Sequence, residues 1–403
     1  MPKKGLVIKA KELETDVAVV KDLEVSIGRV IDETWTEPVG PTPFPSIPDL
    51  REWDFKLLQR YKPMYMPFCD LCCLCTYGKC DLTKDKRGAC GLNMAAQQSR
   101  IVLLACCIGA ATHLGHARHM VDHLIEKFGR RYPLDVGGVN VQLEAPITRL
   151  VCGVRPQTLD DLEEVVDYLE EQLTHLLSAA HTGQESSNLD FESKVFHAGM
   201  VDHVALEVAD IAQVAVYNFP KADPEAPLVE LGYGTINTHK PVIMVVGHNV
   251  ISSIGIIDYL KENDLHADVE VTGLCCTAHD TTRYSSKAKI VGPISWQLRF
   301  IRSGVPDVIV LDEQCIRADT LIEAQKVKAP VIVTSDKNCA GLQNRTKDTA
   351  DEIVADLVNG KVKGVLILDS EKAGEVASRT ALEVAPKRKK FKGIPRLEEI
   401  IES

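Results

Sequence analysis

The sequence lacks any uninterrupted apolar run of the roughly 18–20 residues that a helix needs to cross a bilayer. Its first residues, MPKKGLVIKAKELETD, include neither a long apolar core nor a cleavage site, so they do not indicate a signal peptide. The chain has little positive charge relative to negative charge, with a formal net charge of −11. That sign argues against a general nucleic-acid binder and against a basic membrane-surface protein. No internal repeat of fixed period is present. We therefore expect a cytoplasmic protein without a membrane span.

Cysteine, by contrast, is abundant, with 13 residues in a chain of 403. In a reducing cytoplasm such thiols are metal ligands or buried side chains, not disulfides. Six of them fall within 22 residues, at Cys69, Cys72, Cys73, Cys75, Cys80 and Cys90. A [4Fe–4S] cluster takes four thiolates, so six supply one cluster and half of another. The odd pair could become a complete site where two copies of the chain meet on a twofold axis.

The first half of the chain is expected to be mostly helical. Residues 1–35 suggest one or two short strands, and residues 36–49, with five prolines, read as an extended arm. The apolar periodicity predicts helices over 101–128, 158–182 and 190–216. The second of these has the strongest pattern: Thr158 and Asp161 form a capping box with Asp in place of Glu, and Gly183 is a plausible stop. Its apolar stripe is Leu159, Leu162, Val166, Leu169, Leu173 and Leu176.

From about residue 238 short apolar runs alternate with amphipathic stretches, which is the pattern of βαβ units and a parallel sheet. The expected strands are 241–248, 267–276, 306–315, 330–335 and 363–370. The expected helices are 252–262, 292–303, 318–327 and 348–359.

The predicted fold class is therefore α/β, with a helical N-terminal domain that carries Fe–S clusters and a Rossmann-like parallel-sheet domain after it. We expect an N-terminal extension and Pro-rich arm in 1–60 and a helical cluster domain in 61–235. The α/β domain is expected in 236–385, and 386–403 reads as a basic linker that leads toward a further region.

Three predicted strands end on metal-ligand residue types: His248 in VVGHN, Cys275–Cys276 in GLCCT and Cys315 in DEQC. The carboxyl ends of parallel strands line the crevice where open α/β folds bind ligands. One imidazole and two thiolates suit iron, nickel or zinc. Taken singly, each has a simpler interpretation, a buried small apolar thiol or a hydrogen-bonded structural histidine. Cys106, Cys107, Cys152 and Cys339 lack such support and are expected to be mostly buried thiols.

Four histidines in ATHLGHARHMVDH share one face of a predicted helix: His113, His116, His119 and His123. Histidine titrates near neutral pH and can pass protons, so a stripe from interior to surface could conduct them. The alternative is a solvated helix face with some buried, hydrogen-bonded histidines.

Together these motifs resemble the nickel-containing carbon monoxide dehydrogenases. The residues that carry the resemblance are the cysteine run, the four-histidine helix and the GHN, GLCCT and DEQC strand ends. The similarity extends over roughly residues 60–400. It is greatest to the alpha subunits of the acetyl-CoA decarbonylase/synthase complexes of methanogenic archaea, which also have a Pro-rich N-terminal extension.

The resemblance implies a role for each of these side chains. It implies a [4Fe–4S] cluster within the subunit, held by Cys72, Cys75, Cys80 and Cys90. Cys69 and Cys73 would share a second [4Fe–4S] cluster with a twin subunit. The nickel–iron–sulfur active cluster would take His248, Cys276 and Cys315 as ligands. His113 would lie beside bound CO, and His116, His119 and His123 would relay protons away from it.

The implied reaction is the reversible oxidation of CO with water to CO2, with electrons passed through the clusters to ferredoxin. The implied partners are a second copy of the chain, a small epsilon subunit and the other subunits of the complex. The family's alpha subunit is about twice as long and continues into a ferredoxin-like region with further ligands of the active cluster. This chain therefore resembles the N-terminal half of that subunit, and it ligates the active cluster only in part.

Three alternatives stay open at this point. The chain could be an electron-transfer or scaffold half-subunit that holds the cysteine-run clusters without its own catalysis. It could be a zinc-stabilised structural protein, since short cysteine spacings also bind zinc. The hybrid-cluster proteins share the general fold and an N-terminal cysteine run, but the CysCys pair at 72–73 and the GLCCT element favour the dehydrogenase.

Overall fold

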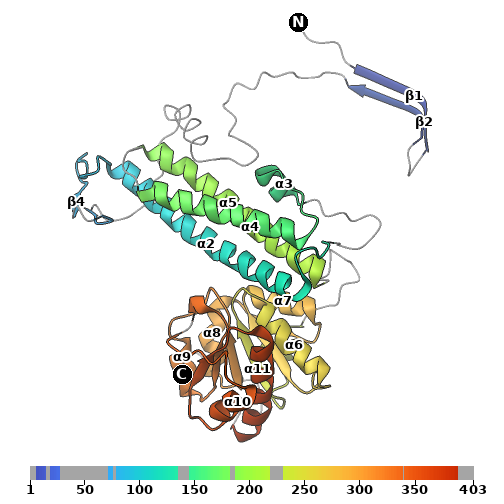
Figure 1. The fold of residues 1–403 in the computed structure, drawn as a ribbon, viewed down its shortest axis with the longest axis vertical. Coiled ribbons are helices and arrows are strands. Elements are labelled where there is room, and N and C mark those ends of the chain that lie inside the picture. The colour runs from blue at the N-terminus through green and yellow to red at the C-terminus, as the bar shows by residue number, and fades with distance from the viewer. Residues whose placement is uncertain are drawn as a thin grey trace.

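The computed structural model describes residues 6–14, 19–27, 71–75, 79–134, 145–181, 187–217, 230–338 and 340–388. A bundle of long helices lies against a twisted parallel sheet that has helices on both of its faces (Figure 1). The expected fold class is confirmed. The proposed domain limits stay a prediction. Cys69, Cys339, Gly183 and the Pro-rich segment 36–49 lie outside the described residues.

Three long helices form the bundle: α2 (Met94–Phe128), α4 (Leu159–His181) and α5 (Asn188–Val216), with a short α3 (Pro146–Cys152) beside them. The helix α2 begins where the Asn93 side chain accepts a hydrogen bond from the Ala96 N–H, seven residues before the predicted start. Ser187 caps α5 in the same way. The Asp161 carboxylate accepts the Thr158 N–H at 2.9 Å at the start of α4.

The apolar stripe predicted for α4 is confirmed, because all six of its residues are buried in the bundle core. That core also includes Val250, Ile251 and Ile254 at the start of α6 (Ile251–Glu262). The bundle and the sheet part therefore share apolar contacts, which fixes one against the other.

In the described part of the chain the sheet has seven strands in the order β11-β10-β9-β6-β7-β8-β5, and its neighbouring strands pair parallel. The strands are β5 (Glu230–Leu231), β6 (Val242–Val246), β7 (Glu270–Leu274), β8 (Lys289–Gly292), β9 (Val308–Leu311), β10 (Val331–Val333) and β11 (Gly364–Leu366). Numbered from β6, the six strands β6 to β11 have the order 3-2-1-4-5-6 of the doubly wound fold. Strand order reverses between β6 and β9, so the ligand crevice is expected at that point.

Successive side chains of β6 point to opposite faces of the sheet, and each face is covered by a different set of helices. Ile243 and Val245 belong to a core formed with α6, α10 (Ala350–Val358) and α11 (Ser370–Val384). Val242, Met244 and Val246 belong to the core on the other face, which includes side chains of α8 (Gln297–Arg302) and α9 (Thr320–Lys326). Figure 1 shows α8 and α9 on one side of the sheet and α6, α10 and α11 on the other.

The predictions for this half were correct for five strands and for α6, α9 and α10. The helix expected at 292–303 is shorter, and it follows a strand, β8, that the sequence pattern did not indicate. The helices α7 (Cys276–Tyr284) and α11 and the edge strand β5 were also missed. Short strands of two to four residues such as these have too little sequence for a period to show.

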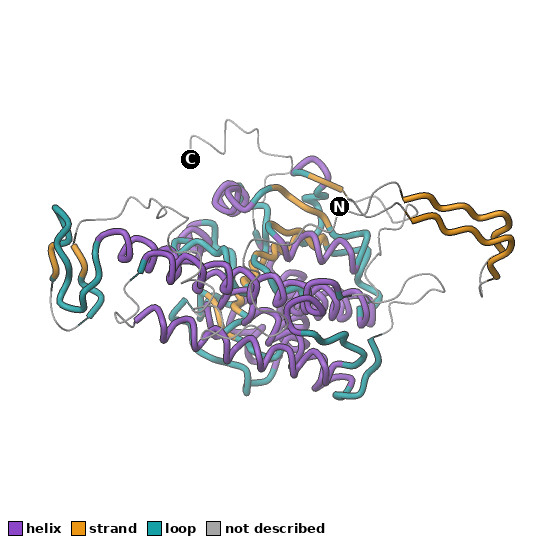
Figure 2. Tube along the Cα trace, turned by 90° about the horizontal axis from the view of Figure 1, so that it is seen from above, coloured by secondary structure: helices purple, strands orange, loops and turns teal. Residues whose placement is uncertain are grey.

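Two small hairpins complete the described structure (Figure 2). The expected strands near the N-terminus are β1 (Leu6–Glu14) and β2 (Val19–Ile27), which pair antiparallel. The strands β3 (Leu71–Cys72) and β4 (Cys80–Asp81) also pair antiparallel, with Cys72 opposite Cys80. The hairpin β3–β4 lies at the start of α2, at the opposite end of the bundle from the sheet (Figure 1).

Among the described helices, α2 is long and apolar enough to cross a membrane by length and composition. Length and composition alone are weak grounds, because the core helix of a bundle passes the same test. Part of the apolar surface of α2 is used in packing, since Leu103, Leu114, Met120 and Leu124 are buried in the bundle core, whereas Ile108 is exposed.

Candidate metal centres

The three ligand-bearing strand ends converge at the predicted point of the sheet. The side-chain ligand atoms of His248, Cys275 and Cys315 all lie within 4.8 Å of one another. They follow β6, β7 and β9, which are neighbours across the point where strand order reverses. Cys276, which the resemblance offered as the ligand, begins α7 and hydrogen-bonds to His248 and Cys275. Both cysteines of the pair therefore adjoin the imidazole, and we call this group the sheet-end site.

A fully buried carboxylate connects the segments that carry these ligands. Asp312 Oδ1 accepts the backbone N–H of His248 at 2.7 Å and that of Asn249 at 3.2 Å. Its other oxygen accepts the hydroxyl of Thr277, next to Cys276, at 2.6 Å. Asp312 itself lies three residues before Cys315. One side chain thus fixes the strand ends of β6, β7 and β9 relative to one another.

The backbone at this site is strained. Cys275 has φ 70°, Gln314 has φ 65° and Cys315 has φ 52°, all in the left-handed region that non-glycine residues rarely adopt. Such conformations cost about 1–3 kcal/mol each and cluster at functional sites. Gly247, before His248, has φ 140° and lies so close to Asp312 that a Cβ there would be 1.7 Å from Oδ1.

The two thiols of the CysCys pair differ in acidity. Hydrogen bonds from Cys275 and His248 lower the pKa of the Cys276 thiol to about 4. The thiolate is the form that binds metals. The neighbouring Cys275 has its pKa raised, first by its hydrogen bond to Cys276 and then by burial, so the two thiols ionise at different pH.

The histidine stripe begins at the sheet-end site. The ring of His113 lies 5.9 Å from that of His248, centroid to centroid. His113 Nδ1 hydrogen-bonds to Asp202 Oδ1 of α5 at 2.6 Å, which orients the imidazole and leaves Nε2 free to face another group. The sequence analysis did not identify Asp202, because this residue lies on α5, far from the histidines along the chain.

The next two histidines are joined through Glu313. His116 is buried, and its Nδ1 donates to Glu313 Oε1 at 3.3 Å. Asn249 Nδ2 donates both to that oxygen, at 3.2 Å, and to His119 Nδ1, at 2.9 Å. A continuous hydrogen-bonded path therefore connects His116 to His119 through side chains that follow β9 and β6.

Lys337 completes the surroundings of Glu313. Its ammonium group donates to Glu313 Oε2 at 2.6 Å and to the Gly115 carbonyl at 3.0 Å. Burial raises the pKa of Glu313, but the hydrogen bonds from His116 and Lys337 outweigh it and lower the pKa to about 2. The carboxylate is therefore ionised and accepts from both partners at neutral pH.

The outer histidines open to solvent. His119 and His123 line a surface cavity of 550 Å³ together with Asp122, Glu126 and Glu371. Burial lowers the pKa of His119, and burial with the charge of Lys127 lowers that of His123 to about 4. Both rings are consequently neutral near pH 7, with one nitrogen to donate and one to accept. The stripe predicted from sequence thus runs from the sheet-end site to a surface cavity.

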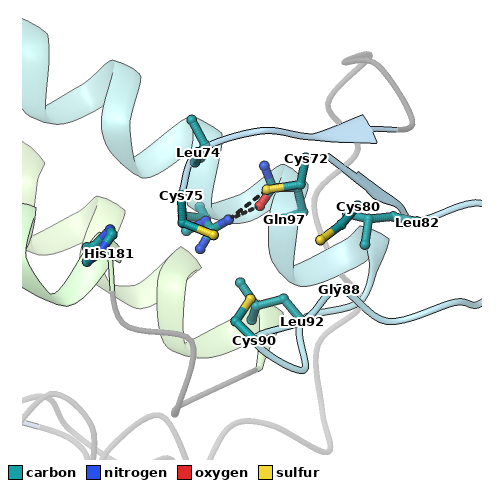
Figure 3. A pocket seen from close by; sticks show the side chains of 11 residues that line it. Cys72, Leu74, Cys75, Cys80, Leu82, Gly88, Cys90, Leu92, Gln97 and His181 are labelled. Atoms are coloured by element: carbon teal, nitrogen blue, oxygen red, sulfur yellow. Dashed lines mark hydrogen bonds between the residues drawn. The ribbon is translucent and has the colours of Figure 1, made fainter. Parts of the chain in front are cut away.

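A second site lies at the other end of α2. Four thiols line one cavity of 180 Å³ (Figure 3): Cys72, Cys75, Cys80 and Cys90. Figure 3 shows their sulfur atoms around a common space, between the loop that follows β4 and the start of α2. Leu74, Leu82 and Leu92 contribute apolar surface, and the Ala89 N–H donates to Cys80 Sγ at 3.4 Å. We call this group the four-cysteine site.

The donor set of the four-cysteine site fits a [4Fe–4S] cluster, which takes four thiolates with hydrogen bonds to sulfur. Cys73 is exposed and does not line the cavity. Burial raises the pKa of Cys107 to about 11 and that of Cys152 to about 12, so these are the buried thiols that the sequence predicted. Cys106 is half-buried.

Several functional side chains escaped the sequence analysis. Asp312 and Glu313 belong to the quoted DEQC motif, and Asn249 to VVGHN, so their adjacency to ligands was a usable signal. Lys337 and Asp202 lie far from any motif in sequence. Only the folded chain brings them to the histidines.

Comparison with known families shows to which family the chain belongs. Residues 70–134 and 140–392 match the Prismane/CO dehydrogenase family. The chain belongs to the Prismane/CO dehydrogenase family. Both the four-cysteine site and the sheet-end site lie within the matched residues.

Curated relatives within this family are alpha subunits of acetyl-CoA decarbonylase/synthase complexes. That of Methanothermobacter thermautotrophicus is 58% identical over 98% of this chain and 51% of its own length. That of Methanocaldococcus jannaschii is 55% identical over 97% of this chain and 51% of its own. The chain therefore spans about half the length of the curated relatives it matches.

Solved structures share the fold at low sequence identity. One describes nickel-containing [Fe4S4] clusters in alpha subunits of acetyl-CoA synthase/carbon monoxide dehydrogenase, with a TM-score of 0.60 at 18% identity over 83% of this chain and 54% of that one. Carbon monoxide dehydrogenase IV from Carboxydothermus hydrogenoformans also gives 0.60 at 18% identity, over 82% and 58%. The resemblance predicted from the motifs is thus confirmed at the level of family and fold.

Proposed function

We propose that this chain is the N-terminal half of a carbon monoxide dehydrogenase component of an acetyl-CoA decarbonylase/synthase complex. The reaction is CO + H2O ⇌ CO2 + two electrons + two protons. The observation that carries the proposal is the convergence of His248, Cys275 and Cys315 at the switch point of the sheet, with His113 beside them.

In this proposal the sheet-end site holds part of a nickel–iron–sulfur cluster, with His248, Cys315 and one or both thiols of Cys275–Cys276 as ligands. When bound, that cluster would supply the metal that binds the carbon and accepts its two electrons. Its remaining ligands come from residues outside the described part of the chain or from another polypeptide. Asp312 keeps the ligand-bearing strand ends in register with one another.

His113 is positioned to exchange a proton with the substrate, since Asp202 holds its Nδ1 and leaves Nε2 available. Protons then pass outward by way of His116, His119 and His123. The ionised Glu313 and the amide of Asn249 hold the two middle rings in fixed orientations. The acidic rim of the surface cavity, at Asp122, Glu126 and Glu371, favours release of protons to solvent.

Electrons are proposed to leave through a [4Fe–4S] cluster at the four-cysteine site. A second [4Fe–4S] cluster, shared by Cys69 and Cys73 with the same pair of a second copy, would follow it. The final acceptor is ferredoxin. A small epsilon subunit and the other subunits of the complex complete the assembly, which we place in the cytoplasm.

Metal analysis of the anaerobically purified chain tests this proposal. We expect a brown dimer with about six iron atoms per chain, four from the internal cluster and half of the shared four. Nickel and CO-dependent reduction of an electron-accepting dye are expected once the polypeptide with the remaining ligands is added. A colourless, iron-free monomer would refute both the clusters and the dimer.

A second candidate follows from the length of the chain, which is about half that of its relatives. The chain could serve as an electron-transfer or scaffold half-subunit that holds only the cysteine-run clusters. The same analysis separates the two: about six iron atoms per chain, with no nickel and no dye reduction in any assembly, favours the scaffold.

A further inference from the structure

The four-cysteine site contains a buried cation. Arg100, on the second turn of α2, is 4% exposed and lines the cavity. Its Nη2 donates to Cys72 Sγ at 3.2 Å and also to the side-chain oxygen of Gln97. Its Nε is buried without an acceptor among the described residues. A guanidinium so placed has a thiol sulfur as one of its principal partners.

A buried charge is costly unless an opposite charge compensates for it. Among the described residues no carboxylate forms an ion pair with Arg100, whereas the thiolates of a bound cluster would surround one side of the same cavity. Cluster assembly would therefore supply negative charge directly beside Arg100. The cation in turn matters most when the cluster gains further negative charge.

We propose that Arg100 raises the reduction potential of the cluster at the four-cysteine site, so that this cluster readily takes up an electron. This inference rests on the proposed function, since it requires a cluster there. Reduction adds one electron to the cluster, and no bond forms or breaks. Charge-assisted hydrogen bonds to sulfur and net charge are two of the properties that set the potentials of iron–sulfur clusters.

Burial is what distinguishes Arg100 from the other cations of this region. Arg87 lies on the loop between Cys80 and Cys90, where it donates to the Gly91 carbonyl at 2.7 Å, and it is exposed. Water and salt screen an exposed charge strongly, whereas a buried charge acts through a medium of low dielectric constant. Arg87 therefore provides a matched control with the same charge, on the loop that connects two of the site's cysteines.

The test is a redox titration of the anaerobic chain with dithionite, followed by the electron paramagnetic resonance signal of the reduced cluster. Loss of that signal in Cys80→Ser assigns it to the four-cysteine site. We expect Arg100→Gln to shift the midpoint potential to more negative values at unchanged iron content. Arg87→Gln is expected to shift it much less, and Arg100→Lys, which keeps the charge, to lie between Arg100→Gln and the wild type.

Each alternative outcome is decisive. If Arg100→Gln keeps its iron and titrates like Arg87→Gln, Arg100 does not tune the cluster and the proposal is wrong. If Arg100→Gln loses iron, Arg100→Met provides a second neutral variant for the same comparison. Loss of iron from both neutral variants would make Arg100 a residue of site assembly and also overturn the proposal. Failure of the proposed function is recognised separately, because the wild-type chain would then contain no iron or sulfide.

Discussion

Gly247→Ala is expected to lower the free energy of unfolding by about 3–5 kcal/mol and to abolish metal binding at the sheet-end site. A Cβ at this position would lie 1.7 Å from Asp312 Oδ1 and 2.7 Å from the Glu313 carbonyl oxygen. Neither group can move freely, because Asp312 holds the ends of β6 and β7 and Glu313 accepts from His116. The clash must therefore displace His248, the adjacent ligand.

Gly304→Ala is the matched control for this variant. Gly304 also has a positive φ, 68°, but a Cβ there would meet nothing within 4 Å. The control therefore includes the backbone strain, about 1–2 kcal/mol, without the steric clash. Chemical denaturation of the two variants gives the free energies, and nickel and iron analysis of the completed enzyme reports the site. Equal destabilisation by the two substitutions would show that Asp312 does not confine this backbone.

The double variant His116→Gln, His119→Gln is expected to reduce turnover of the complete, active enzyme by about 10²-fold or more. Glutamine keeps a hydrogen-bonding side chain but cannot accept a proton near neutral pH. The path from His113 to the surface cavity would lose both rings that Glu313 and Asn249 connect. We also expect the pH dependence of turnover to change, because a different group would then limit proton transfer.

The corresponding control replaces two exposed histidines, His175 and His239, with glutamine. His175 has 53% of its side chain exposed on α4, and neither residue lines the histidine path. Turnover of this control should match the wild type. Rates of dye reduction across pH 6–9 give the turnover of both double variants and its pH dependence. Iron and nickel contents confirm that the clusters are retained. A relay variant with wild-type turnover and an unchanged pH profile would eliminate the histidine path.

The sequence analysis succeeded where an element has a readable local pattern, and it missed several others, among them the 15-residue helix α11. The six-residue apolar stripe of α4 extends over several turns, so its period could be read, and all six residues are buried. Runs such as that of β6 are buried on both faces and bounded by Pro241 and Gly247, and these too were found. β5 and β8 are two and four residues long, and they exist because neighbouring strands pair with them. Strands this short have no sequence periodicity from which they could be predicted.

For the candidate sites the sequence supplied ligands and the fold supplied their surroundings. Cysteine spacing showed that six thiols lie close together along the chain, and the resemblance to the family selected Cys72, Cys75, Cys80 and Cys90 among them. The sheet-end ligands were predicted because parallel strands end at one edge. Arg100, Asp202 and Lys337 could not be assigned in this way, since each reaches its site from a different element.

By itself the sequence determined which chemistry this protein can support: many thiols for iron–sulfur clusters, one imidazole at a strand end and a helix face of four histidines. Those properties depend on residue type and on short-range spacing, which the chain fixes before it folds. Only the tertiary structure decided that Cys275 lies within the ligand group, that Glu313 and Asn249 connect the histidines, and that Arg100 is buried against Cys72. The physical reason is that burial and contacts between distant segments arise from packing α2 against the sheet edge and the cysteine loop, and no local pattern encodes them.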